Sequence, residues 1–371
     1  MGESDRIKKY SRIKYTLAIV DILFTLLVLA VFQTSGLAVD LRESVEGLFT
    51  NPLLVIFIYS LILFLLYSLL GLPLDYYRSY SIEHRFGLSQ EKFPHWLTDQ
   101  LKELLVGFVI FIILVESFFY CLRYYPDNWW WIAGLFWIFF SVILAKLFPN
   151  LIIPLFFKYK RIKDEELRQR ILNLANKMAI KILDVYQIDF SKKTTKANAA
   201  LVGLGKSKRV ILTDTLQGKF TPDEIEVILA HEFAHYRLRH IIKTLVLNAI
   251  TIMLVFYLFF RYAGLVFDRF NLNPADIAGL SIWLFCFMLL QLVLTPFLNT
   301  LSRIMESNAD KLALGVTKNI DAFISMMEKL SLQNLSERDP AKWIKILFFD
   351  HPPVVERVKL AEGLRYAGSK M

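Results

Sequence analysis

Cysteine is nearly absent from this chain, and its scarcity excludes two kinds of protein. The 371 residues hold only two cysteines, Cys121 and Cys286, and both lie inside apolar runs. Two such residues provide neither the disulfide framework of a small secreted fold nor a zinc site built from thiolates. Histidine is also scarce, with six in the chain. A metal site in this protein therefore has to use imidazole and carboxylate ligands.

Acidic residues are fewer than basic ones, which leaves a net charge of +9. In a soluble protein this excess would suggest nucleic-acid binding, but the chain contains no nucleic-acid-binding motif. Lys and Arg instead cluster at the ends of apolar segments, where anionic lipid head groups attract them. We therefore expect the lipid bilayer, and no nucleic acid, among the partners of this protein.

Long apolar runs dominate what is present. Hydrophobic residues make up 55% of the chain, which is the composition of a membrane protein. A helix needs about 20 mainly apolar residues to cross a bilayer. Six segments meet this requirement, at 15–32, 53–72, 104–122, 130–148, 244–267 and 278–298. The sequence thus predicts a mainly α-helical, multi-pass membrane protein.

Basic residues flank the predicted spans unevenly. They are frequent before the first span, between the second and third, and after the fourth, and they are rare in the other connections. By the positive-inside rule, both termini and the segment 149–242 face the cytoplasm.

The stretch 231–235 has the sequence His-Glu-Phe-Ala-His. Residues four apart on a helix lie one turn above each other, so the imidazoles of His231 and His235 can converge on one metal ion. Glu232 lies beside them, where its carboxylate can take a proton from metal-bound water and pass it to a leaving amine. A solvated helix face with the same spacing is the alternative, but the apolar run before the motif disfavours it. The pattern predicts one zinc ion and metal-assisted hydrolysis.

The start of this helix is predicted independently of the motif. Thr221, Pro222 and Glu224 occupy the N-cap, first helical and capping-box positions. An apolar packing face follows at 225–230, and the motif comes next on the same helix.

A catalytic zinc site takes three protein ligands and leaves a position for water, so the two histidines need a partner. The helix predicted over 299–314 carries Glu306, which we expect to be the third ligand. Asp310 follows one turn further on, where a carboxylate can orient an imidazole. Near the C-terminus, His351 precedes two prolines and is either a turn residue or a donor that stabilises a tetrahedral oxyanion.

A soluble segment lies between the fourth and fifth predicted spans. We expect a helix at 164–179 and strands at 184–190, 197–204 and 209–213, with Gly203, Gly205 and Ser207 forming a turn. A strand beside the metal helix can pair with an extended peptide through backbone hydrogen bonds. Asn198 and Ala199 are the candidates for this substrate-binding edge.

Several further segments, in order along the chain, complete a pattern. They are Ile-Glu-His-Arg-Phe-Gly-Leu-Ser at 82–89, Pro-Asn-Leu-Ile-Ile-Pro-Leu-Phe at 149–156, Asn198-Ala199, the metal helix through His240, Pro296 with Asn299, Ser302-Arg303, Glu306, Ala309-Asp310, and His351-Pro352-Pro353 with Glu356-Arg357. Together they resemble the integral-membrane zinc metallopeptidases that include the type I CAAX prenyl proteases and, more distantly, the HtpX-like proteases. The resemblance runs over nearly the whole chain after the first span.

This resemblance implies a set of site residues and an architecture. It implies His231, His235 and Glu306 as zinc ligands, Glu232 as the general base, Asn198 as a substrate-binding residue, and Asp310, His351 and Arg357 as supports of the site. Together with the chemistry above, we expect Glu232 and His351 to be catalytic, and Asn198 and Ala199 to bind the substrate. It also implies a transmembrane helical barrel around a water-filled chamber, with a zincin-like α+β portion that contains a small sheet. Two departures stand out. The chain shows no counterpart of the extra N-terminal span of the eukaryotic members, and Ala200-Leu201 follow Asn198-Ala199 where aromatic residues are frequent.

We expect four regions: four spans in 1–148, a cytoplasmic insert with sheet and metal helix in 149–243, a two-span hairpin in 244–301, and a helical region that completes the site in 302–371. The predicted function is that of a membrane zinc endopeptidase. Its substrates are prenylated CAAX-type C-termini, or membrane-associated and misfolded proteins. The alternative is a non-proteolytic membrane scaffold or transporter with a structural zinc. The compact chain favours a bacterial or archaeal cell membrane over the endoplasmic reticulum.

Overall fold

The structure, a computed structural model, describes residues 2–203 and 208–368. Within these ranges, six helices are long and apolar enough to cross a membrane. They are α1 (Glu3–Thr34), α3 (Pro52–Asp75), α5 (Phe93–Tyr124), α6 (Trp129–Leu147), α10 (His240–Phe267) and α11 (Leu280–Thr317), and several continue into short helical extensions. Each of the six predicted spans falls on one of these helical segments, which confirms the multi-pass, mainly helical class.

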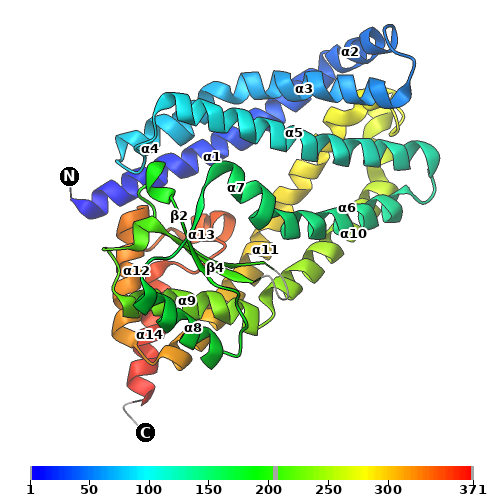
Figure 1. The fold of residues 1–371 in the computed structure, drawn as a ribbon. Helices are drawn as coiled ribbons and strands as arrows, with labels where there is room; N and C mark the ends of the chain where they lie inside the picture. The colour runs from blue at the N-terminus through cyan, green and yellow to red at the C-terminus, as the bar shows by residue number, and fades with distance from the viewer. Residues whose placement is uncertain (1, 204–207, 369–371) are drawn as a thin grey trace.

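An aromatic cluster joins four of the long helices at the end remote from the strands (Figure 1). Phe118 of α5 meets Trp283 of α11 edge to face at a centroid distance of 5.0 Å. Trp129 of α6 and Phe256 of α10 are in contact at 5.9 Å. Edge-to-face pairs of this kind are favourable in addition to the burial of their apolar surface. This end of the helical region is therefore its packed core.

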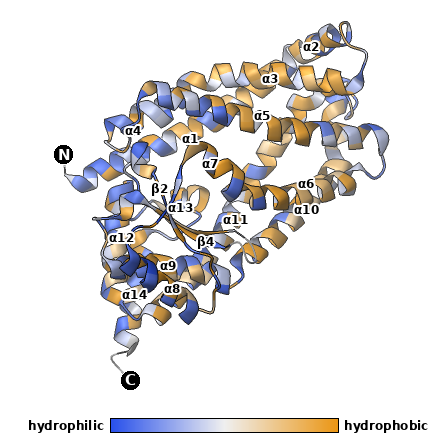
Figure 2. Cartoon of the chain, in the orientation of Figure 1, coloured by the Kyte–Doolittle hydropathy of each residue, from blue (hydrophilic) through white to orange (hydrophobic). Residues whose placement is uncertain are grey.

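Hydropathy divides the molecule into two parts. Figure 2 shows that the long helices are mainly hydrophobic, whereas the helices around the strands are mixed or hydrophilic. A bilayer around the hydrophobic helices leaves the strands and the helices that cover them outside the hydrocarbon region.

The soluble part contains a four-stranded mixed sheet in the order β1-β2-β4-β3. The strands are β1 (Tyr159–Arg161), β2 (Val185–Ile188), β3 (Ala199–Val202) and β4 (Arg209–Thr213), and only the β2–β4 pair is parallel. The three predicted strands are confirmed, although Leu204, Gly205 and Ser207 lie outside the described residues. Strand β1 was not predicted, because its Tyr-Lys-Arg sequence has no apolar alternation and its pairing depends on β2.

Helices cover this sheet and form its core. They are α8 (Glu165–Lys177), α9 (Pro222–Arg237), α12 (Ile320–Asn334) and α14 (Val354–Gly368). Helix α13 (Lys342–Phe348) packs against α11 instead, and α2 (Leu37–Glu46), α4 (Ile82–Arg85) and α7 (Ile153–Phe156) are short connections. Leu229 and Phe233 of α9 are fully buried among Leu174 of α8 and Met326 of α12. The metal helix is thus the central element of the soluble core.

The last span and the helix that follows it are one element. The sequence predicts that the chain continues as a helix over 299–314 after a span that ends at 298, and α11 runs without interruption from Leu280 to Thr317 and contains Pro296. Helix α13 (Lys342–Phe348) packs against this helix just beyond the proline, where the Asn299 amide donates to the Leu347 carbonyl at 2.9 Å. The continuous helix carries Glu306 rigidly from the membrane region to the face of α9.

Glu224 closes the capping box at the start of α9 and also joins α9 to α12. Its carboxylate accepts hydrogen bonds from the Thr221 N–H at 2.8 Å, the Ser325 hydroxyl at 2.6 Å and the Lys329 ammonium at 2.8 Å. Burial alone would raise the pKa of the Glu224 carboxyl, but these partners outweigh burial and hold its pKa below the usual range. The ionised carboxylate therefore stabilises the helix that carries both histidines.

Replacing Glu224 with alanine is expected to lower the free energy of unfolding by roughly 2 kcal/mol, because the cap is lost and buried donors are left without a partner. Folding lowers the pKa of this group, so its stabilisation is present above the unfolded pKa of about 4.3 and disappears as pH falls through the folded value. Melting temperatures in detergent should therefore differ at neutral pH and approach each other as the pH falls below about 4.3. The control Glu166→Ala removes an exposed carboxylate and should melt with the wild type. Equal melting of E224A and wild type at neutral pH would contradict this role.

Candidate metal centre

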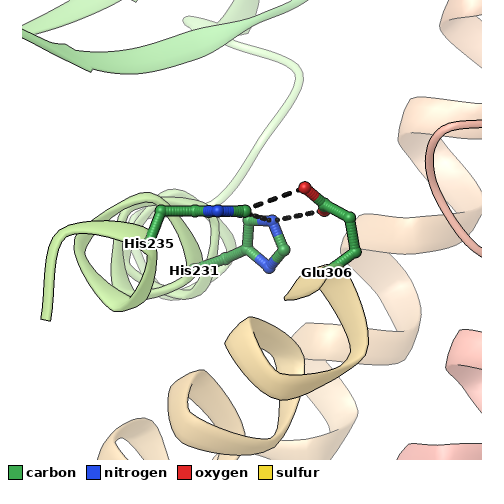
Figure 3. A group of neighbouring side chains, drawn as sticks. All are labelled: His231, His235 and Glu306. Carbon is green, nitrogen blue, oxygen red and sulfur yellow. Dashed lines mark hydrogen bonds and ion pairs between the residues drawn. The ribbon is translucent and has the colours of Figure 1, made fainter. Parts of the chain in front are cut away.

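His231 and His235 lie one turn apart on the same face of α9. Their Nε2 atoms are 3.1 Å apart, and the two rings are nearly perpendicular at an interplanar angle of 74°. Figure 3 shows both side chains directed toward Glu306. The helical spacing predicted from the sequence thus brings the two imidazole nitrogens together.

Glu306 reaches the two histidines from α11, which packs against α9 (Figure 3). Its Oε2 atom lies 3.1 Å from His231 Nε2, and its Oε1 atom lies 3.2 Å from His235 Nε2. The three residues each offer one ligand atom within 4.8 Å of the others, a group that can hold a metal ion. Two imidazoles and one carboxylate form one of the ligand sets of catalytic zinc sites.

The hydrogen bonds around this group fit a bound cation. The Nδ1–H of His231 donates to Asp310 Oδ1 at 2.8 Å, so the lone pair of its Nε2 faces Glu306 Oε2. That carboxylate oxygen is buried and has no hydrogen-bond partner among the described residues. Two lone pairs at this separation repel each other unless a proton or a metal ion lies between them. The donor chemistry of the site therefore suits a divalent ion.

The surroundings of His231 favour positive charge. Burial alone would lower the pKa of this imidazole, but its interactions with Asp310 and Glu306 outweigh burial and raise the pKa to about 9. A pocket that attracts a proton so strongly also attracts a metal cation, because the same two carboxylates supply the negative potential.

Asp310 and Arg357 form a buried pair behind His231. Arg357 donates to both carboxylate oxygens of Asp310, from Nε at 2.7 Å and from a terminal nitrogen at 2.5 Å. Asp310 is fully buried, and the bidentate geometry fixes its orientation. Asp310 can therefore set both the tautomer and the ring orientation of His231.

Replacing Asp310 with alanine is expected to weaken zinc binding about 10- to 100-fold, because His231 loses the carboxylate that orients it. Competition with a fluorescent zinc chelator measures this affinity. Lys311→Ala, which removes an exposed side chain from the same helix, is the control and should bind zinc as the wild type does. Unchanged zinc affinity in D310A would show that Asp310 does not orient the ligand.

His240 is a neighbour of the site that the sequence did not identify as a functional residue. It begins α10, and its Nδ1 atom lies 3.1 Å from His235 Nδ1. Between α9 and α10 the chain turns through Arg239, which has a left-handed φ of 57°. This break in the helix places His240 beside His235, a contact that regular helical spacing does not predict. If His235 binds a metal through Nε2, its Nδ1 carries the proton and donates to His240 Nδ1.

A cavity of about 140 Å³ opens on the metal-binding group. Its lining includes His231, Glu232, Asn198, Ala199 and His351, so the structure brings the predicted catalytic and substrate-binding residues to one place. Burial raises the pKa of the Glu232 carboxyl above its usual range, although the neighbouring histidines oppose this shift. A carboxyl with a raised pKa is a better proton acceptor at neutral pH than an ordinary glutamate.

His351 lies in the turn before two prolines and also beside the site. Its Nε2 atom is 3.4 Å from Glu306 Oε2, and its Nδ1 atom is 2.8 Å from Asp350 Oδ1. The hydrogen bond with Asp350 raises the pKa of the His351 imidazole and outweighs its burial. His351 therefore lies in a turn and close to Glu306, and its role as a donor to an oxyanion stays a prediction.

The fold and the site together define a class, the membrane-embedded metalloproteases, and comparison with known proteins gives the family. Residues 161–365 match the profile of Peptidase family M48. Residues 3–158 match the profile described as CAAX prenyl protease N-terminal, five membrane helices, and the described part of this range holds four candidate spans. The chain belongs to peptidase family M48. It is a multi-pass integral membrane protein and a metalloendopeptidase, whose substrate is a peptide or protein.

Similar proteins occur in bacteria and eukaryotes. The chain is 30% identical over 360 residues to the uncharacterized metalloprotease YhfN of Bacillus subtilis, a match that covers 96% of this chain and 84% of that protein. It is 27% identical to CAAX prenyl protease 1 of Saccharomyces cerevisiae, covering 78% and 68% of the two chains. The crystal structure of S. mikatae Ste24p superposes with a TM-score of 0.86 at 23% identity, over 97% of this chain and 89% of that chain. The predicted chamber-forming fold is thereby confirmed, and a scaffold or transporter is not favoured.

Proposed function

We propose that this protein is a zinc endopeptidase that cleaves peptide bonds beside the cytoplasmic face of the membrane. The convergence of His231, His235 and Glu306, with Glu232 on the adjoining cavity, is the observation that carries this proposal. His231, His235 and Glu306 would hold the zinc. When bound, zinc lowers the pKa of water and polarises a carbonyl group.

The side chains around the cavity support a mechanism of hydrolysis. Glu232 takes a proton from the attacking water and delivers it to the amine that leaves. His351, whose Nδ1 atom pairs with Asp350 Oδ1, donates from Nε2 to the oxyanion that develops on the attacked carbonyl. Asp310 and Arg357 hold His231 in position. The peptide pairs with Ala199 at the outer edge of β3, and Asn198 lies beside it on the cavity as the second substrate-binding residue.

The proposed orientation rests on charge and on contacts between the N-terminal helix and the soluble part. Lys14 of α1 and Lys196, which precedes β3, bind the same carboxylate of Glu83 at 3.2 Å and 2.8 Å. The basic N-terminus and the metal-binding part are thus at the same end of the spans, the cytoplasmic end by the positive-inside rule. We retain the four regions 1–148, 149–243, 244–301 and 302–371. We favour a bacterial or archaeal cell membrane, in line with the similarity to a Bacillus subtilis protein.

Two substrate classes are proposed, prenylated CAAX-type C-termini and membrane-associated or misfolded proteins. The names of several relatives support the first, and the bacterial relative leaves the second open. Purified protein should be given a CAAX peptide with its prenyl group, the same peptide without it, and an unfolded protein. Cleavage of the lipidated peptide alone would assign prenyl-peptide processing, and cleavage of all three would assign a general membrane-associated protease. Cleavage of none, in a sample shown to contain zinc, would refute the proposed function.

A further inference from the structure

Among the described residues, no further strand pairs with the outer edge of β3, and the direction of its backbone groups shows which residues face that edge. The Thr213 N–H of β4 donates to the Asn198 carbonyl at 3.0 Å, so Asn198 faces β4. Hydrogen-bonding direction alternates along an antiparallel strand, so Ala199 and Leu201 turn their N–H and C=O groups outward. The partner of Leu201 in β4 is Val210, and the Val210 N–H donates toward β2. Leu201 therefore does not receive this hydrogen bond, which supports its outward direction. An added peptide strand can therefore pair at Ala199 and Leu201.

The same alternation makes Ala197 and Thr195 the preceding outward residues, but the C-terminal end of α12 covers them. Asn334 Oδ1 accepts from the Ala197 N–H at 3.0 Å, and Asn334 Nδ2 donates to the Ala197 carbonyl at 3.2 Å. Gln333 Nε2 donates to the Thr195 carbonyl at 2.6 Å. One side-chain amide thus makes both hydrogen bonds that a neighbouring strand would make. The edge is closed immediately before the residues that line the metal site.

A second, larger cavity begins where the edge closes. It has a volume of about 510 Å³ and shares Asn334, His351 and Arg357 with the cavity at the metal centre. Tyr15 of α1 and Phe348 of α13 contribute to its wall, with ring centroids 5.7 Å apart. These aromatic rings suit apolar side chains of a peptide. The two cavities therefore meet beside Asn334, and a chain that leaves the edge can enter the larger one.

We propose that Asn334 ends the peptide-binding edge of β3 and turns the substrate away from the sheet into the larger cavity. This proposal rests on the proposed function, in which β3 binds the substrate. On one side of the scissile bond the peptide is extended along Ala199 and Leu201. On the other side it bends past Asn334 toward Tyr15 and Phe348. The enzyme then selects segments that can bend next to the cleaved bond, such as chain termini and unfolded loops, and rejects rigid strands.

Photo-crosslinking tests this path without relying on turnover. A cleavable peptide carries one benzophenone amino acid, placed in turn at each position on either side of the scissile bond. Each peptide is irradiated with the zinc-loaded Glu232→Gln protein, and the attached residues are mapped by mass spectrometry. Positions on one side should attach to β3, and positions on the other to the cavity wall around Tyr15 and Phe348. Crosslinks from both sides to β3 and to 195–197 would overturn the proposal.

Asn334→Ala in the same background opens the edge at Ala197. Crosslinks to the cavity wall should fall about three- to tenfold relative to crosslinks to 195–197. The loss of one or two hydrogen bonds is expected to change the populations of the two paths by this factor. Asn334→Asp keeps the acceptor for the Ala197 N–H and should shift the pattern less, which provides a second variant if N334A does not fold. Asn173→Ala removes an exposed amide from α8 and should leave the pattern unchanged. An unaltered pattern in folded N334A would show that Asn334 does not direct the peptide.

Cleavage by the wild type is scored separately from these crosslinks. Cleavage combined with crosslinks along a straight path would overturn this inference and leave the proposed function intact. The expected crosslinks without any cleavage would support the path and refute the proposed proteolysis.

Discussion

Replacing Glu232 with glutamine is expected to lower kcat about 10²- to 10⁴-fold, the contribution of a positioned general base. Glutamine keeps the size and shape of the side chain but cannot take the proton from the attacking water. It leaves His231, His235 and Glu306 unchanged, so the zinc content should stay at one ion for each chain. Activity on an unfolded protein substrate, measured beside zinc content by mass spectrometry, checks both statements.

A matched substitution on the same helix separates chemistry from folding. Glu226 pairs with Arg170 at 2.8 Å on the surface of α9. Glu226→Gln should therefore retain nearly full activity. An E232Q protein that keeps wild-type kcat would remove Glu232 from the mechanism, and one that loses its zinc would show that Glu232 acts through the site's structure instead.

Removing the metal is expected to abolish activity and also to lower stability. Without zinc, the buried Glu306 carboxylate loses the divalent cation that balances its charge, and only protons on the neighbouring imidazoles can replace it. Ligand binding stabilises the folded state by RT ln(1 + [L]/Kd), about 2.7 kcal/mol when free zinc is 100 times Kd. Chelation should therefore lower the melting temperature, and added zinc should restore both the melting temperature and the activity.

The Glu306→Ala variant extends this experiment to the ligand set. It should retain no activity above the assay background, and added zinc should raise its melting temperature much less than that of the wild type, because only two ligands remain. Glu356→Ala is a useful control, because this carboxylate forms an exposed pair with Lys345 at 2.6 Å. Full activity after exhaustive chelation, or a normal zinc response in E306A, would contradict the assignment of the site.

Local sequence was sufficient for the elements whose geometry depends on near neighbours. The capping box at Thr221 and Glu224 and the four-residue spacing of His231 and His235 are properties of a single helix, and the structure has both. The apolar runs were sufficient for the six spans, because a bilayer requires a fixed length of hydrophobic helix. Glu306 was predicted as a ligand because a catalytic zinc site needs a third ligand beside the two histidines. Helical spacing could not show that it lies near α9, because it belongs to another helix.

Tertiary structure decided what depends on residues far apart in the chain. The packing of α11 against α9 brings Glu306 to the histidines, the turn at Arg239 places His240 beside His235, and pairing with β2 makes a strand of β1. The closure of the β3 edge by Asn334 joins segments 137 residues apart and leaves no periodic signal in the sequence. By itself, the sequence determined a membrane protein with a helical pair of metal ligands, because hydrophobic length and helical periodicity are local. Only the fold decided where a substrate peptide can lie, because that depends on which distant backbone and side-chain groups meet.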